Sequence, residues 1–163
     1  MEQHFLTAPE KLAALVYAAH IGSGDRVLEL GSGGGTVAAA LPACTLTLVE
    51  LDSRLAQGLR VRFPEATVLS EDALGVLERH EADVILSNLP HTLTEGVLRR
   101  LGSKTFRRAL IAAHENDDVQ QLARVAQGLS LKLLLTLNGD DFSPPQPFKS
   151  HLILATPHAA CVD

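Results

Sequence analysis

The residues of this chain best suited to chemistry begin with a short glycine-rich segment. Positions 29–36 read Glu-Leu-Gly-Ser-Gly-Gly-Gly-Thr and directly follow Val27 and Leu28. This order predicts a strand that runs into a glycine loop and then a helix, which is a layout that cradles a nucleotide cofactor. Glycine suits such a loop because a tight turn requires a positive φ, and because a side chain would keep the backbone away from a ligand.

The spacing of the glycines indicates the kind of cofactor. A dinucleotide fingerprint starting at Gly31 would need a glycine at position 36, but that residue is Thr36 and the third glycine of the pattern is Gly35. The pattern is therefore Glu29-x-Gly31-x-Gly33-x-Gly35. This form is typical of proteins that bind S-adenosylmethionine.

Two carboxylates stand where they could contact the rest of such a cofactor. Glu50 closes the second predicted strand, 19 residues after Gly31 (50 − 31 = 19), where a carboxylate can accept hydrogen bonds from both hydroxyls of a ribose. NAD enzymes use a carboxylate in the same way, so Glu50 indicates a ribose without identifying the cofactor that carries it. Asp72 follows the third predicted strand and can accept from the amine of an adenine. Alternatively, Glu71 or Asp72 only caps the helix that begins near Leu74.

A third group of residues could bind the methyl acceptor. Ser87-Asn88-Leu89-Pro90-His91 ends the fourth predicted strand. Methyl transfer from a sulfonium to an aromatic amine needs little acid–base help, so positioning supplies most of the rate. The Asn88 side-chain oxygen and the Pro90 carbonyl can accept both N–H groups of that amine, and asparagine does so without ionising. A flat side chain at His91 can stack on the base. The alternative is an ordinary turn after a strand, which Asn and Pro often form.

Hydrophobic periodicity predicts the elements that must position these residues. Helix-period segments alternate with short apolar runs, and no repeat interrupts them. The predicted strands are 26–30, 45–50, 67–69, 83–87, 109–113, 131–137 and 151–155, and the predicted helices are 12–19, 36–41, 55–62, 74–79, 94–101 and 117–127.

This alternation predicts an α/β fold, with a Rossmann-like, mostly parallel twisted sheet of about seven strands and helices on both faces. The segments 138–141 and 144–147 are rich in turn residues and join the last two strands, which predicts an antiparallel C-terminal strand. We expect one domain over residues 1–163, with a cofactor-covering segment and helix at 1–25 and the Rossmann-like core at 26–163. In such a sheet, ligands bind at the carboxyl ends of the strands.

Composition fits a cytoplasmic protein without a metal. The chain has 163 residues, of which 46% are hydrophobic, and no stretch is long and apolar enough for a membrane span. We expect Cys44 and Cys161 to be free thiols, because their spacing suits no metal site and no export signal precedes them. The histidines share no short spacing, so no metal is expected. His114 and Glu115 border the expected ligand site, where a structural histidine is the simpler interpretation.

The charge of the chain does not indicate a general nucleic-acid binder. Its net charge is −5, from 14 Lys and Arg against 19 Asp and Glu. One basic cluster remains, and it is either a solvated helix end or a patch that contacts RNA phosphates. Its members are Arg99, Arg100, Lys104, Arg107 and Arg108.

Six motifs in order along the chain resemble the ribosomal RNA adenine N6-dimethyltransferases and the erythromycin-resistance RNA methyltransferases, which have the class I methyltransferase fold. The motifs are Gln3-His4-Phe5-Leu6, Glu29-x-Gly31-x-Gly33-x-Gly35-Thr36, Val49-Glu50-Leu51-Asp52, Asp72-Ala73-Leu74, Asn88-Leu89-Pro90, and Phe142-x-Pro144-Pro145 followed by Ser150.

The resemblance implies roles for individual residues. Gln3, Gly31 and Glu50 would hold the methionine part and the ribose of S-adenosylmethionine, and Asp72 its adenine amine. Asn88, Pro90 and His91 would bind the acceptor, which in this family is an adenine of RNA methylated at N6. The full set expected to bind the cofactor is Gln3, Phe5, Glu29, Gly31, Gly33, Gly35, Glu50, Leu51, Asp72, Ala73 and Asn88.

Three departures from the family concern the acceptor. His91 stands where Tyr or Phe is usual; it either stacks with less area, in a pH-sensitive way, or is a surface residue of a site for another acceptor. The chain ends 13 residues after Ser150 (163 − 150 = 13), where family members continue into a helical domain. Gln146, Pro147 and Phe148 replace the more usual Pro, Lys and Val.

Three functions therefore remain open. The first is an S-adenosylmethionine-dependent methyltransferase that modifies adenine N6 in ribosomal RNA. The second is a methyltransferase for a small molecule or a protein amide or amine. The third is a noncatalytic module that binds S-adenosylmethionine. The oligomeric state is not predicted.

Overall fold

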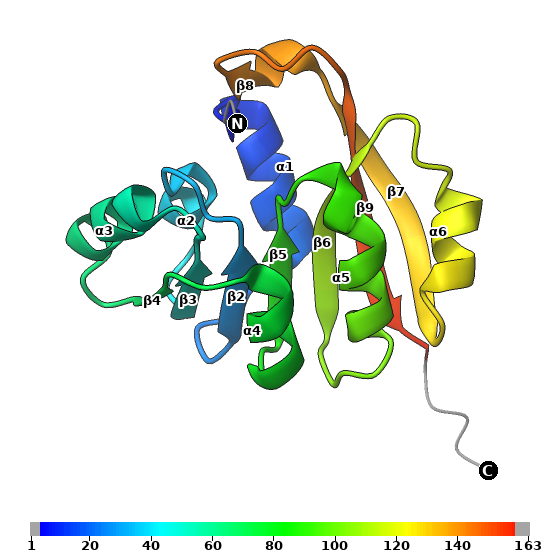
Figure 1. The fold of residues 1–163 in the computed structure, drawn as a ribbon, viewed down its shortest axis with the longest axis horizontal. Helices are drawn as coiled ribbons and strands as arrows, with labels where there is room; N and C mark the ends of the chain where they lie inside the picture. Colours follow the sequence, from blue (N-terminus) through cyan, green and yellow to red (C-terminus); the bar gives the residue numbers. More distant parts are fainter. Residues whose placement is uncertain (1–3, 159–163) are drawn as a thin grey trace.

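The computed structural model describes residues 4–158, and a seven-stranded sheet forms its centre (Figure 1). The strand order is β4-β3-β2-β5-β6-β9-β7. Strands from β4 to β6 run parallel to their neighbours, whereas β9 runs antiparallel to both β6 and β7. The strands are β2 (Arg26–Leu30), β3 (Thr45–Val49), β4 (Thr67–Leu69), β5 (Val84–Ser87), β6 (Arg108–His114), β7 (Leu129–Leu137) and β9 (Ser150–Pro157).

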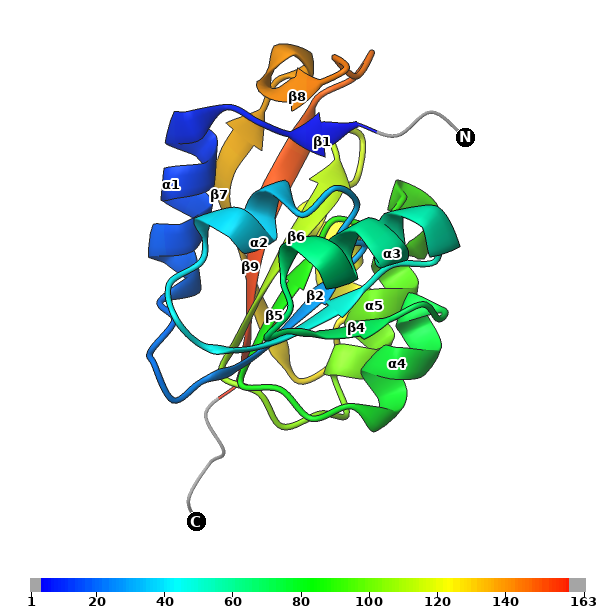
Figure 2. The same cartoon turned by 90° about the vertical axis from the view of Figure 1, so that its left-hand side faces the viewer.

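Helices cover both faces of this sheet (Figure 2). Helices α1, α2 and α3 pack on one face, and α4, α5 and α6 pack on the other. The helices are α1 (Pro9–Ala19), α2 (Thr36–Ala40), α3 (Ser53–Arg62), α4 (Ala73–Arg79), α5 (Thr94–Leu101) and α6 (Val119–Val125), and two 3₁₀ turns are η1 (His91–Leu93) and η2 (Gly139–Asp141). The predicted α/β architecture, including the antiparallel C-terminal strand, is confirmed.

The alternation of side chains along the central strands explains the two layers of helices. In β2, Val27 packs toward α1 and Leu28 toward α4 and α5, and both are fully buried. A strand covered on both faces is apolar at successive positions, as in Val84, Ile85 and Leu86 of β5, whereas Glu29 interrupts the apolar residues of β2. This packing leaves the carboxyl ends of β2, β3, β4 and β5 side by side at one edge.

A second, two-stranded sheet joins the N-terminal segment to the loop before β9. Strand β1 (Phe5–Leu6) pairs antiparallel with β8 (Phe142–Ser143). Backbone N–H groups of Thr7 and Ala8 donate to the Asp141 carbonyl at 2.9 and 3.1 Å, and His4 Nδ1 bonds the Pro144 carbonyl at 2.8 Å. These contacts hold the N-terminal segment against β8.

Several predicted boundaries were wrong, although each predicted element exists. Helix α1 begins at Pro9 and not at residue 12, because proline fits the first turn of a helix. Helix α6 covers only Val119–Val125, since the Asp118 side chain caps it by accepting from the Gln120 N–H at 2.9 Å. Strands β1 and β8 were not predicted, because two-residue strands have no periodicity to detect.

Three further expectations concern the chain outside the site. Cys44 is a free thiol, whereas Cys161 and Gln3 lie outside the described residues. No helix within residues 4–158 has the length and apolar character to cross a membrane. The same part of the chain contains no group of three or more His, Cys, Asp or Glu residues placed to hold a metal ion.

Candidate active site

The glycine loop between β2 and α2 has the backbone that its sequence predicts. Gly31 and Gly33 have φ values of 75° and 54°, in the left-handed region that favours glycine. A Cβ atom on Gly33 would lie 2.6 Å from the Phe5 ring, so a side chain there would collide with β1. Phe5 thus lies directly on the loop, and the expected covering of a cofactor by the N-terminal segment stays a prediction.

Glu50 connects this loop to the end of β3. Its side chain is buried, with 7% of its surface exposed. One carboxylate oxygen accepts from the Gly33 N–H at 2.8 Å and the other accepts from the Asp52 N–H at 2.9 Å. Each carboxylate oxygen has a second lone pair, so these bonds position Glu50 and still leave acceptor capacity for ribose hydroxyls.

Glu29 points into the core and not onto the surface of the loop. It is 3% exposed, and its Oε2 atom has no hydrogen-bond partner among the described residues. It lines a small apolar cavity together with Leu15, Val37 and Phe142. Burial, assisted by the negative charge of Glu50, raises the pKa of Glu29 to about 8. Glu29 therefore holds its proton at neutral pH in the protein without a ligand.

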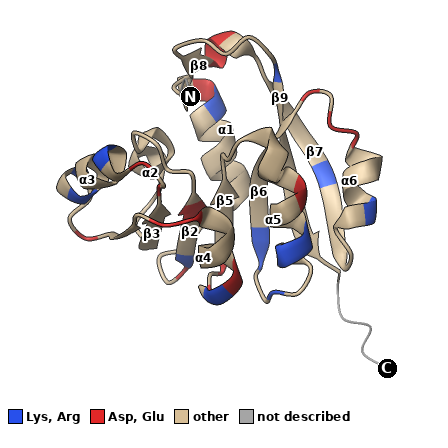
Figure 3. Ribbon diagram, viewed as in Figure 1, with Lys and Arg blue, Asp and Glu red and all other residues tan. Residues whose placement is uncertain are grey.

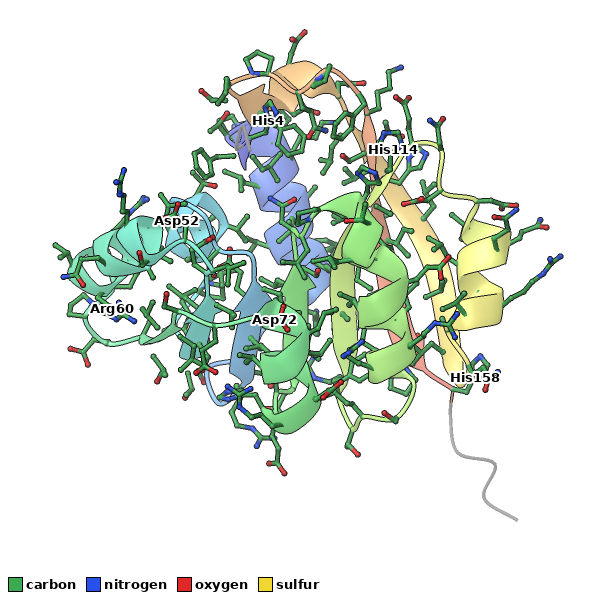
Figure 4. The ribbon with its side chains drawn as sticks, in the orientation of Figure 1. His4, Asp52, Arg60, Asp72, His114 and His158 are labelled. Atoms are coloured by element: carbon green, nitrogen blue, oxygen red, sulfur yellow. The ribbon has the colours of Figure 1, made fainter. Side chains whose placement is uncertain are left out.

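The remaining residues expected around the cofactor follow β3 and β4. Leu51 is 73% exposed, an unusual degree for a leucine, and comes directly after Glu50. Asp72 caps α4 by accepting from the Gly75 N–H at 2.8 Å, as Asp52 caps α3 (Figure 4). Asp72 therefore caps the helix with one of its two carboxylate oxygens, and its expected contact with an adenine amine stays a prediction. Ala73 is buried beneath this cap.

The segment after β5 presents Asn88 and Pro90 to solvent. Asn88 continues the sheet, because its N–H donates to the Leu30 carbonyl at 3.1 Å, and its side chain is exposed. The Pro90 carbonyl accepts from the Leu93 N–H at 2.8 Å, which closes η1. One lone pair of that carbonyl is therefore used, and the second is the one that can accept from a ligand amine.

The glycine loop and the Asn88 segment touch one another. A Cβ atom on Gly31 would lie 2.8 Å from the Asn88 carbonyl oxygen and 2.9 Å from the Leu89 side chain. Any residue larger than glycine would push the two segments apart. The structure thus brings together Phe5, Gly31, Gly33, Glu50 and Asn88, which come from three separate strand ends and from β1.

Two aromatic residues that the sequence did not assign to the site lie beside His91. The ring centroid of His114 is 5.1 Å from that of His91, and the ring centroid of Phe148 is 4.7 Å from that of His114. His114 had been interpreted as structural, and Phe148 only as a departure from the family. His114 pairs with Ser150 between β6 and β9, which brings Phe148 close to His114. This register could not be predicted from the sequence.

The basic cluster lies at the opposite edge of the sheet. Helix α5 starts after Asn88 and runs back, so its last turn lies at the amino ends of the strands (Figure 3). Arg99 and Arg100 belong to that turn, Arg107 precedes β6, and Arg108 is the first residue of β6. Most of these side chains already have partners, which favours the solvated-helix-end alternative. Arg100 pairs with Glu78 at 2.8 Å, Arg99 with Glu95 at 3.7 Å, Arg107 with Asp25, and Arg108 donates to the Ala18 carbonyl at 2.8 Å.

Comparison with known proteins shows which proteins this chain resembles. The family model described as "Ribosomal RNA adenine dimethylase" matches residues 1–116. The chain is 31% identical to a probable ribosomal RNA small subunit methyltransferase A of Pyrobaculum aerophilum, with 100% of this chain and 76% of that protein aligned. It is 29% identical to a mitochondrial ribosomal RNA small subunit methyltransferase of Arabidopsis thaliana, over 95% of this chain but only 46% of that protein.

Solved structures support the same fold. A dimethyladenosine transferase from Plasmodium falciparum superposes with a TM-score of 0.83 at 23% identity, over 95% of this chain and 64% of that one. The 23S rRNA methyltransferase ErmE gives a TM-score of 0.80 at 19% identity, over 95% of this chain and 70% of that one. These likenesses confirm the expected methyltransferase fold.

Proposed function

Since this chain belongs to the ribosomal RNA adenine dimethylase family, we propose that it transfers a methyl group from S-adenosylmethionine to the N6 amine of an adenine in ribosomal RNA. The observation that carries the proposal is the contact between Gly31 and Asn88, which sets the cofactor loop directly beside the acceptor segment. An in-line transfer needs the methyl donor and its acceptor side by side.

The residues around the loop fit S-adenosylmethionine. Gly31 and Gly33 let the loop pack closely against the Asn88 segment and Phe5, and the buried Glu50 has spare acceptor capacity for a ribose. Exposed Leu51 offers an apolar surface to an adenine, while Asp72 keeps one oxygen for the adenine amine. The remaining residues assigned to the cofactor are Gln3, Phe5, Glu29, Gly35, Ala73 and Asn88. When bound, the cofactor supplies an already activated methyl group.

Asn88 and Pro90 orient the amine of the acceptor. The lone pair of an aromatic amine is delocalised into its ring, so the amine must be held by both N–H groups to aim that lone pair. The Asn88 side-chain oxygen and the free lone pair of the Pro90 carbonyl supply two acceptors on one short segment. Because η1 fixes the Pro90 carbonyl, that hydrogen-bond acceptor is held in place before the substrate amine arrives. His91 adds a stacking surface next to them.

The proposed function includes an expected compartment and an expected surface for RNA. We expect the protein to act in the cytoplasm, although one relative is a mitochondrial protein, so the family alone does not fix the compartment. RNA is expected to approach the carboxyl edge of the sheet, since Asn88 and His91 are exposed there.

The test is transfer of labelled methyl from S-adenosylmethionine to small ribosomal subunits, total RNA, protein and a metabolite extract in parallel. Asn88→Ala should abolish transfer while leaving cofactor binding within a few-fold, measured by calorimetry. Gln121→Ala, which removes an exposed amide on α6, is the matched control and should transfer normally. Label in protein or metabolites alone would support the second function, and cofactor binding without any transfer would support a noncatalytic module.

A further inference from the structure

His91, His114 and Phe148 form a cluster of three aromatic rings at the rim of the candidate site. The His91 and His114 centroids are 5.1 Å apart, those of His114 and Phe148 are 4.7 Å apart, and those of His91 and Phe148 are 6.4 Å apart. All three distances fall in the range of direct aromatic contact. The rings come from η1, from the end of β6 and from the segment before β9, so only the folded sheet brings them together.

Backbone hydrogen bonds hold two of these rings in place. Strands β6 and β9 continue to pair beyond His114, because the Glu115 N–H donates to the Lys149 carbonyl at 3.0 Å and the Lys149 N–H donates to Glu115 Oε1 at 3.1 Å. This pairing fixes Phe148 alongside the end of β6. His114 is at the carboxyl edge, far from His158 at the other edge (Figure 4).

One hydrogen bond orients the His114 ring. The Asn116 N–H donates to His114 Nδ1 at 3.1 Å. The flat ring packs against the Phe148 ring and can offer its surface to a nucleobase.

The three rings differ in their exposure to solvent. His91 is exposed, whereas His114 and Phe148 are half-buried behind it. His91 also follows Pro90 directly, and the Pro90 carbonyl is one of the two proposed acceptors for the substrate amine. The ring planes of His91 and His114 meet at 55°, and those of His114 and Phe148 at 36°. The cluster is therefore an angled wall that can offer a face and an edge to one planar ligand.

Resting on the proposed function, we propose that His114 and Phe148 are positioning residues that brace His91, so that the three rings form a composite stacking wall for the acceptor adenine. An imidazole alone covers less of a purine than a larger ring does. The Phe148 and His114 rings restore that area and restrict how His91 can turn. The purine would stack here while Asn88 and Pro90 hold its amine.

Fluorescence of 2-aminopurine tests this wall without depending on methyl transfer. The probe is a single-stranded oligoadenylate RNA with one central 2-aminopurine, added to protein saturated with S-adenosylhomocysteine. The chain has no tryptophan and one tyrosine, so the signal comes from the probe. Because 2-aminopurine lacks the N6 amine, its quenching reports stacking and not the contacts of Asn88.

We expect the unaltered protein to quench the probe and Phe148→Val to need at least about fivefold more protein for half-quenching. Tyr17→Val removes the only tyrosine, which is 86% exposed on α1, and should quench like the unaltered protein. Thermal unfolding checks that Phe148→Val is folded. Adding His91→Phe to Phe148→Val should restore quenching, which a purely structural role for Phe148 would not allow.

The two proposals fail in different ways. Equal quenching by all variants, or quenching that His91→Phe does not restore, would overturn the stacking wall. Absence of quenching by the unaltered protein would also overturn it. Loss of the proposed function would instead appear as cofactor binding without methyl transfer to RNA in the parallel assay described above.

Discussion

Glu50 shows at the residue scale how one buried carboxylate organises the cofactor loop. Its two oxygens accept from the backbone N–H groups of Gly33 and Asp52, so it links the loop after β2 to the cap of α3. In Glu50→Gln, one of these N–H groups would face an amide NH₂ and lose its acceptor. A buried donor left without an acceptor costs about 1–3 kcal/mol.

We therefore expect Glu50→Gln to lower both thermal stability and affinity for S-adenosylmethionine. The measurements are thermal unfolding without ligand and calorimetric titration with the cofactor. Glu65→Gln, which changes an exposed carboxylate after α3, is the control and should alter neither quantity. An unchanged melting temperature in Glu50→Gln would contradict the role given to these two hydrogen bonds.

Glu29 makes the stability of the ligand-free protein depend on pH. Burial raises its pKa to about 8 in the folded protein, against an ordinary value of 4.5. The folded state therefore keeps a proton that the unfolded state loses, and stability falls as the pH rises from about 4.5 to about 8. The size of the effect is of the order of a few kcal/mol.

Glu29→Gln removes this dependence, because a neutral amide does not ionise. Measured by urea unfolding at pH 5, 7 and 9, the difference in stability between the variant and the unaltered protein should shift in favour of the variant as the pH rises. Parallel curves over this range would show that Glu29 ionises at its ordinary pKa in the fold.

At the scale of elements, the observed cap of Asp72 and its proposed contact with the cofactor can be separated by substitution. Asp72 caps α4 through the Gly75 N–H, and we propose that it also accepts from the cofactor adenine. Asparagine is as good a helix cap as aspartate, whereas alanine is not. Asp72→Ala should thus lose about 1 kcal/mol of stability, and Asp72→Asn almost none, in urea unfolding.

Asp52 is the matched control for this prediction. It caps α3 by accepting from Arg54 and Leu55. Asp52→Ala should lose similar stability but retain more cofactor affinity than Asp72→Ala. Equal losses of affinity in both variants would mean that Asp72 acts only as a cap.

The elements that position the site were largely predictable, because buried strands and amphipathic helices have short-range patterns. The bounds of β2 (Arg26–Leu30), β4 (Thr67–Leu69) and α5 (Thr94–Leu101) match the prediction. The positive-φ glycines of the loop were predicted from their spacing, and the place of Asn88 directly after β5 from the end of the fourth predicted strand. The family expected from six motifs is also confirmed, by the match over residues 1–116.

The features that could not be predicted from the sequence depend on contacts between residues far apart in the chain. Strands β1 and β8 exist only because Phe5 and Ser143 pair across the fold. The same holds for the contact of Phe148 with His114, which follows from the register of β6 and β9. Neither residue carries a local pattern that distinguishes it from an ordinary loop aromatic or a structural histidine.

At the scale of the whole molecule, the basic cluster and the candidate site lie at opposite edges of the sheet. Arg99 and Lys104 lie near the amino ends of the strands, whereas Lys149 lies beside Phe148 at the carboxyl edge. Contacts to RNA phosphate are made by nearby cations and weaken with salt. Lys149→Gln should therefore raise the KM for RNA several-fold, whereas Arg99→Gln with Lys104→Gln should not. The reverse result would place RNA on the amino edge.

The chain spans 46% of the length of its Arabidopsis thaliana relative, so its activity has to be measured on this chain itself. The most direct measurement is mass spectrometry of nucleosides from small-subunit ribosomal RNA incubated with the protein and S-adenosylmethionine. We predict N6-methyladenosine or N6,N6-dimethyladenosine with the unaltered protein and neither with Asn88→Ala. Methylated RNA nucleosides other than these, or none despite bound cofactor, would contradict the proposed reaction at adenine N6.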